Sequence, residues 1–176
     1  MIDKNVIWQA FRDQANTAIG SSLSQVGGVP AIIWPSYMSG NKVAPLPPEY
    51  PYLVINVTPL NTISHSGLTS VIDDADDKTV LKRLERYLIT FNCYGYSSNS
   101  IINDLHFSFD IDSARDSIRA STGGAIRSIS NPLPSSTKFA ERFVETSEFN
   151  IVWVAANELK DANSTIIETV NLTYNF

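Results

Sequence analysis

The first part of the chain has apolar residues spaced as on one face of a helix. Behind Asp3, they recur at intervals of three and four: Ile7, Ala10, Phe11, Ala15, Ala18 and Ile19. Asp3 is a suitable N-cap, and the glycines and serines of GSSLSQVGG end the segment. A short strand bounded by prolines, VPAIIWP (29–35), and a proline-rich surface loop, SYMSGNKVAPLPPEYP (36–51), are expected next.

Two alternating segments in the middle of the chain predict a β-hairpin. YLVINVTPL (52–60) places Leu53, Ile55 and Val57 on one face, and RYLITFNCY (86–94) alternates in the same way. The long connection between them has β-like flanks and an acidic centre, DDADD. We therefore interpret residues 52–96 as one long antiparallel hairpin that projects from its sheet. Such a projection has little to pack on in a monomer, so its tip is a candidate partner contact: His65, Asp73, Asp74, Asp76 and Asp77.

The period then becomes helical, with Ile101, Ile102, Leu105 and Phe109 on one face behind Ser98 or Asn99 as the cap. Asp112 is expected to cap a second, short helix, which TGG ends. AIRSIS predicts a return to strand before the turn residues NPLPSS.

The last third of the chain predicts two strands. FNIVWVAAN (149–157) is apolar on both faces, as in a central strand covered on both sides, and we expect Trp153 to be buried against the helices. LKDANST turns the chain, and IIETVNLTYNF (166–176) alternates to the end. The whole pattern predicts one α+β domain over residues 1–176, with a mainly antiparallel or mixed sheet and helices on one face.

Composition narrows the function classes. The 176 residues are 43% hydrophobic and 18% charged, with a net charge of −5, which disfavours a protein that grips phosphates through a basic face. No apolar segment of membrane-spanning length and no secretory signal are expected. The single cysteine, Cys93, lies on an apolar strand face, which predicts a buried thiol in a protein made in a reducing cytoplasm.

The motifs that could carry chemistry are weak. The turn YGYSSN (94–99) has one glycine, too few for a phosphate-binding loop, so we interpret it as a join in which Gly95 breaks the strand and Ser98 caps the helix. DDADD resembles the start of a calcium loop, but Lys78 and Thr79 occupy positions that need an oxygen ligand and a glycine. Neither His65 nor His106 has a ligand at metal-binding spacing, and no nucleophile motif is present. We expect no catalytic, cofactor or metal site.

The layout resembles a known family. The strand AIIWP, the proline-rich loop, PYLVINVTPL, RYLITFNCYGY, a helix pair and the turn TGGAI are similar to phage neck or tail terminator proteins, from about residue 5 to residue 174. The resemblance implies an α+β subunit without catalytic residues. It also implies a ring, of six copies in this family, at the neck of the virion, assembled in the host cytoplasm. The implied partners are the tail tube protein, the sheath if there is one, and head-completion proteins, with DNA passing through the lumen. The connection 61–80 departs from the pattern.

Two other interpretations remain open at this point. One is a head-completion or adaptor ring subunit of the head–tail connector. The other is a small non-catalytic α+β domain that binds a ligand or nucleic acid, for which the cluster Lys78, Lys82, Arg83 and Arg86 would be the basic surface.

Overall fold

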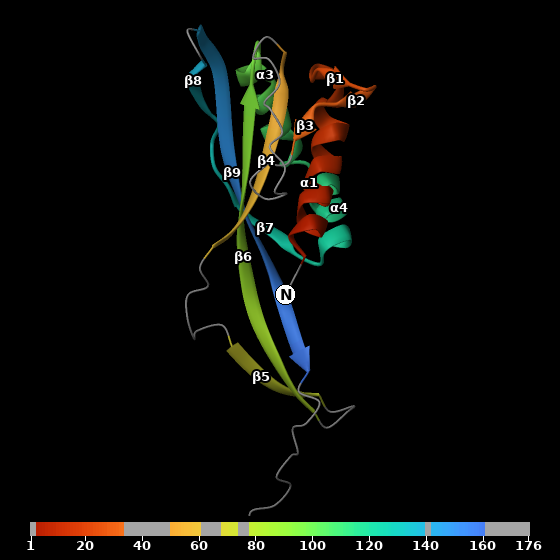
Figure 1. Cartoon of the computed structure of the whole chain (residues 1–176). Coiled ribbons are helices and arrows are strands. Elements are labelled where there is room, and N and C mark those ends of the chain that lie inside the picture. Colours follow the sequence, from red (N-terminus) through yellow and green to blue (C-terminus); the bar gives the residue numbers. More distant parts are fainter. Residues whose placement is uncertain (1–2, 34–49, 61–67, 74–77, 140–141, 161–176) are drawn as a thin grey trace, which may run out of the picture.

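The computed structural model describes residues 3–33, 50–60, 68–73, 78–139 and 142–160 (Figure 1). Three α-helices and one 3-10 turn are described: α1 (Lys4–Ile19), η1 (Gly20–Ser22), α3 (Ser98–Ser108) and α4 (Asp112–Thr122). The described strands are β1 (Gln25–Val26), β2 (Val29–Pro30), β3 (Ile32–Ile33), β4 (Tyr52–Leu60), β5 (Leu68–Asp73), β6 (Lys78–Tyr94), β7 (Ala125–Ile129), β8 (Leu133–Phe139) and β9 (Arg142–Lys160).

Seven of the described strands form one mixed sheet. Its order is β3-β4-β6-β9-β7, with β5 also beside β6 and β8 also beside β9. β3 runs parallel to β4, and the other pairs are antiparallel. β1 and β2 form a separate small hairpin, whose turn residues Gly27 and Gly28 both have positive φ (61° and 80°), as a tight hairpin turn requires.

β6 and β9 form the long axis of the sheet. They contain 17 and 19 residues, against about 5–6 in an average strand, and they pair from Val80↔Lys160 to Tyr94↔Thr146. β4 and β5 lie one after the other along the same side of β6. β4 pairs with residues 86–94, and β5 pairs with residues 78–83.

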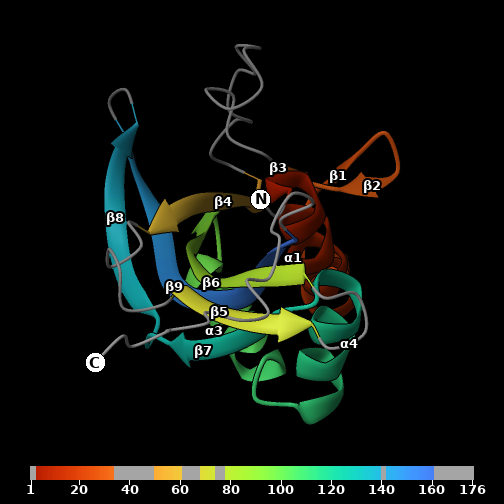
Figure 2. The same ribbon diagram turned by 90° about the horizontal axis from the view of Figure 1, so that it is seen from below.

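The helices pack on one face of this sheet and enclose the core (Figure 2). The odd-numbered residues of β4, β6 and β9 meet α1, α3 and α4, and ring contacts join the layers: Phe91 stacks on Phe149 at 4.7 Å and meets Phe11 edge-on at 6.0 Å. Trp153 is fully buried in this cluster, which confirms the prediction. The structure thus confirms the α+β class with its helices on one face.

Several local predictions need correction. The cap of α3 is Ser97, not Ser98 or Asn99. The cap of α4 is Ile111, not Asp112, and neither cap makes a side-chain hydrogen bond. Residues 149–157 are central, between β6 and β7, but the described helices cover one face only, and Val152 and Val154 on the other face are half-buried. The predicted turn at NPLPSS contains the start of β8, and β9 begins before residue 149. The predicted strand 166–176 lies outside the described residues.

Candidate assembly surface

The sheet extends beyond the helices at one end. This extension, here called the arm, comprises β5, residues 78–84 of β6 and residues 156–160 of β9, and Figure 1 shows it reaching past the end of α1. The arm has three strands with β6 in the middle, paired to β5 on one side and to β9 on the other. The sheet body therefore ends in a three-stranded ribbon that none of the described helices covers.

The predicted tip residues are only partly placed. Asp73 is the last residue of β5, opposite Lys78 of β6. His65, Asp74, Asp76 and Asp77 lie outside the described residues, so the tip contact stays a prediction. Asp73 and Lys78 are paired at the ends of β5 and β6, and residues 74–77 connect them in the sequence.

The turn after β6 joins two parts of the scaffold. Gly95 has φ +98°, and a Cβ placed there would lie 2.8 Å from the carbonyl oxygen of Tyr50, so both conformation and space favour glycine. Its N–H donates to Glu145 O at 3.0 Å, which ties the turn to the start of β9. Gly95 thus ends the strand as predicted.

Cys93 is a core residue. Its side chain is fully buried between β4 and β9, and burial, with a smaller effect of Glu145, raises the pKa of the thiol to about 12. The thiol is therefore protonated at neutral pH and has little nucleophilic character.

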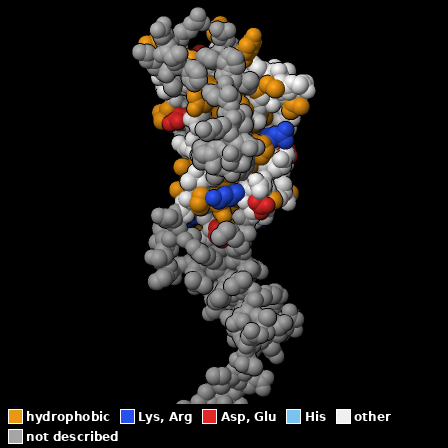
Figure 3. Space-filling view, viewed as in Figure 1, with side chains coloured by type: hydrophobic (Ala, Val, Ile, Leu, Met, Phe, Trp, Pro, Cys, Tyr) orange, Lys and Arg blue, Asp and Glu red, His pale blue; other side chains and the backbone are white. Residues whose placement is uncertain are grey.

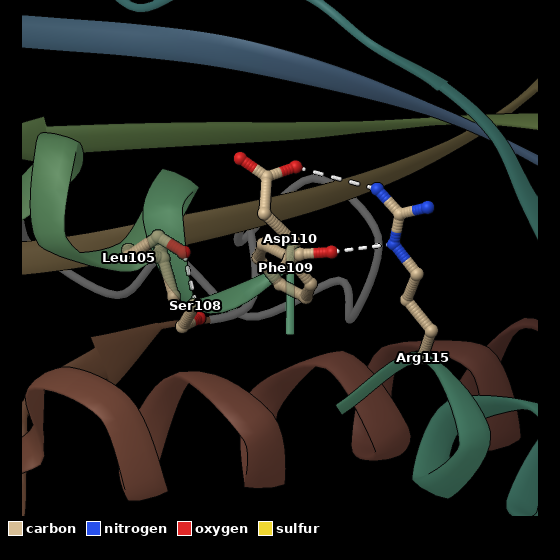
Figure 4. Close-up of polar contacts among 5 residues, drawn as sticks. All are labelled: Leu105, Ser108, Phe109, Asp110 and Arg115. Atoms are coloured by element: carbon tan, nitrogen blue, oxygen red, sulfur yellow. Dashed lines mark hydrogen bonds and ion pairs between the residues drawn. The ribbon is translucent and has the colours of Figure 1, made fainter. Parts of the chain in front are cut away.

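Polar groups near the two C-terminal helices have structural partners. Arg115 donates through Nε to Phe109 O at 2.6 Å and pairs with Asp110 at 3.3 Å, and Ser108 Oγ donates to Leu105 O (Figure 4). These contacts fasten the link between α3 and α4. His106 lies edge-on to Phe149 at 5.4 Å, and no group of three or more potential metal ligands occurs in the part of the chain that the structure describes.

A groove between α1 and α4 was not predicted from the sequence. It has a volume of about 570 Å³ and a mostly polar or small lining that includes Gln9, Asp13, Ser117 and Ser121. Gln9 Nε2 donates to Asp13 Oδ1 at 3.0 Å, so part of this lining is already paired. It contains no titratable group other than Asp13 and does not suggest a reaction.

The sheet face opposite the helices carries uncharged polar and aliphatic residues. Thr90 Oγ1 donates to Asn150 Oδ1 at 2.8 Å across β6 and β9, and Leu88 and Val152 lie beside them, half-buried. At the end of this face Tyr52 stacks on Tyr94 at 5.0 Å. On the face in Figure 3, the described basic side chains are interspersed with other types.

A family model described as "Phage neck terminator protein" matches residues 13–176, nearly the whole chain. The chain belongs to the phage neck terminator protein family. It is therefore a structural protein of the phage neck and tail, which agrees with the resemblance seen in the sequence. No individually curated protein matches it.

In a structural protein of the neck terminator family, surfaces are better candidates for function than pockets. The sequence indicated part of the arm as the outer portion of the predicted hairpin 52–96, and it did not predict that β9 pairs with β6 there. Leu133 at the start of β8 and Phe143 near the start of β9 are 58% and 75% exposed. Leu133 was missed because NPLPSS was interpreted as a turn, and no element was predicted around Phe143. Among the described helices, none is long and apolar enough to cross a membrane.

Proposed function

We propose that this neck terminator subunit forms a closed ring that caps the tail tube and joins it to the head, around the channel through which DNA passes. The partners would be other copies of the chain, the tail tube protein with a sheath where one exists, and the head-completion proteins. The subunit would act as one domain over residues 1–176 in the virion neck, after assembly in the host cytoplasm. The arm carries this proposal.

The dimensions of the arm favour a role in contact between subunits. At about 3.3 Å per residue, the seven arm residues of β6 extend on the order of 20 Å. A ribbon of this kind gains little from packing on its own subunit, because the helix layer does not reach it. A neighbouring subunit can supply the missing surface.

Ring closure follows from repetition of one contact. A head-to-tail contact uses two different surfaces of the subunit, and it ends in a closed ring only if the rotation between copies closes. A ring also suits a terminator, since it leaves one end for the tail tube and the other for the neck. Six copies is the number implied by the family resemblance.

The charge of the subunit suits a channel that DNA must cross. Each contact between a basic side chain and a phosphate strengthens binding, and the chain has 13 Lys and Arg against 18 Asp and Glu. A weakly acidic or neutral lumen would let DNA pass without holding it.

Electron microscopy of the purified protein with isolated tail tubes and, separately, with isolated heads tests the proposal. We expect rings with a central channel at one end of the tubes and no addition to heads. Attachment to heads alone would favour an adaptor ring, and protein that stays monomeric on tails would contradict the terminator role.

Deletion of residues 65–77 tests the arm. This change removes β5 and the tip, so we expect loss of rings and of tail capping. The indole fluorescence of buried Trp153 and the near-UV circular dichroism should stay as in the wild type if the body is intact. A folded deletion variant that still caps tails would remove the arm from the mechanism.

A further inference from the structure

The strand pairing shows which backbone groups face each edge of the sheet. Leu53 donates its N–H to Ala31 O, and Ile55 O accepts from Trp8 Nε1 at 3.2 Å, so the odd-numbered residues of β4 direct their backbone groups away from β6. Backbone groups alternate along a strand. The even-numbered residues of β4 therefore bond to β6, and by the register so do the even-numbered residues of β6 to β4.

The same alternation continues through the rest of the sheet. The odd-numbered residues of β6 direct their backbone hydrogen bonds to β9. They stand opposite odd-numbered residues of β9 along the whole pairing, so the odd-numbered residues of β9 bond to β6. The even-numbered residues of β9 then point away from β6, as Asn150 shows by exchanging hydrogen bonds with Ser130. In β5, Thr69, Val71 and Asp73 bond to β6, and Leu68, Ser70 and Ile72 direct their N–H and C=O groups outward.

The edges of the sheet body are protected against strand addition. On β4, the outward carbonyl of Ile55 already accepts a hydrogen bond from Trp8 Nε1. Residue 59, which also faces outward, is a proline and has no N–H to donate. On β8, the outward position Pro134 likewise has no N–H. β7 is short and has a register shift between Ile126 and Ser128, which also disfavours pairing.

The edges of the arm have no such protection in their backbone. The outward positions are Leu68, Ser70 and Ile72 on β5, and Ala156, Glu158 and Lys160 on β9, and none is a proline. Among the described residues, no strand lies beside either edge. Each arm therefore offers three N–H and three C=O groups on each side.

The two edges match each other. β5 and β9 both run antiparallel to β6, so they run in the same direction, and each presents three outward residues over about six. Copies related by rotation about an axis along the arm would bring β5 of one beside β9 of the next. We propose that neighbouring subunits join in this way, by parallel pairing of Leu68–Asp73 with residues 155–160 of the next copy. This inference rests on the proposed ring and names its contact.

Proline substitutions at outward positions can disrupt the proposed contact between subunits without disrupting the fold of the subunit. Ser70→Pro and Glu158→Pro each remove an outward N–H that makes no bond to β6, and they place a ring against the incoming strand. We expect the melting temperature of the free subunit to stay within a few degrees of wild type, and capped tails to fall at least about tenfold. Ser136→Pro is the matched control, because its N–H faces the free edge of β8 in the body, and it should cap tails as well as the wild type.

Mixing the two variants tests the head-to-tail arrangement. Ser70→Pro keeps an intact β9 edge and Glu158→Pro keeps an intact β5 edge, so the mixture can form one contact but no ring. We expect pairs of subunits and no restored capping. Restoration of rings by mixing would contradict a contact that uses one edge of each kind in every subunit.

A cysteine pair tests the neighbours directly. Ser70→Cys is combined in turn with Asn157→Cys and with Glu158→Cys, because alternate residues of a strand point to opposite faces. Oxidation of assembled rings should give disulfide-linked ladders with one of the two pairs, and each single variant should give no ladder. Cys93 does not interfere, since it is fully buried.

Three results would overturn the inference. The first is wild-type capping by both edge-proline variants. The second is slow amide exchange of Ser70 and Glu158 in the free subunit, since it would mean that the chain's own segments already occupy these edges. The third is ladders absent from assembled rings of both cysteine pairs. If the wild type itself neither forms rings nor caps tails, the proposed function fails instead.

Discussion

At the residue scale, Trp153 is the largest fully buried side chain among the described residues. It is fully buried, lies 5.8 Å from the Tyr87 ring, and fills the space beside Gly124, where any Cβ would overlap the indole. Trp153→Ala should therefore lower the free energy of unfolding by about 3–5 kcal/mol, through lost burial and the cavity left behind. Urea denaturation followed by circular dichroism measures this loss.

Trp153→Phe is the control for that measurement. The indole Nε1 is buried without a hydrogen-bond partner among the described residues, so phenylalanine loses ring volume but no hydrogen bond. We expect a clearly smaller loss than for alanine. An equal decrease in the free energy of unfolding for the two variants would mean that cavity volume does not determine the destabilisation at this site.

At the scale of elements, Ser97, the N-cap of α3, has an unfavourable backbone conformation. It has φ +62°, the only described non-glycine residue with positive φ, and its side chain makes no capping hydrogen bond. Ser97→Gly should raise the free energy of unfolding by about 0.5–1 kcal/mol, because glycine adopts this region without steric cost. Ser97→Val should lower it, and a Gly variant less stable than the wild type in urea denaturation would contradict the argument.

The helices and their caps show what could and could not be predicted from the sequence. The apolar faces of α1, α3, β4 and β6 were predictable, because each packs one side on a shared core and so shows that side in its spacing. The N-cap of α1 was predictable too, because Asp3 Oδ1 accepts from Asn5 N–H at 2.9 Å. The N-caps of α3 and α4 were not, since Ser97 and Ile111 make no side-chain capping bond.

β8 and the first part of β9 were not predicted from the sequence, for a different reason. Leu133, Pro134, Ser135 and Ser136 are all exposed, so this first part of the strand has no buried face and no alternation that would mark it. Its strand character comes from pairing with β9 alone. Of the arm, the sequence could indicate only a long hairpin, because the register decides which backbone groups face the edges that we propose as contacts.

At the scale of the whole molecule, the predicted tip is a concentration of negative charge in the sequence: DDADD places four aspartates in the five residues 73–77. Replacing Asp73, Asp74, Asp76 and Asp77 with asparagine would change the net charge of the chain from −5 to −1. Four carboxylates in five residues can repel one another or bind a cation, and these two cases differ in a measurable way. A cation that binds the folded subunit stabilises it by mass action.

We expect the tip to meet solvent or a partner rather than calcium, since the sequence lacks the oxygen ligand and the glycine of a calcium loop. The melting temperatures of the wild type and the four-Asn variant should therefore both be independent of millimolar calcium, with chelator as the reference. A rise of several degrees in the wild type that the variant lacks would show a metal site. If the tip instead meets a neighbouring ring, the Asn variant should keep its melting temperature and lose tail capping, and salt should weaken capping by the wild type because the tip's charges are then screened.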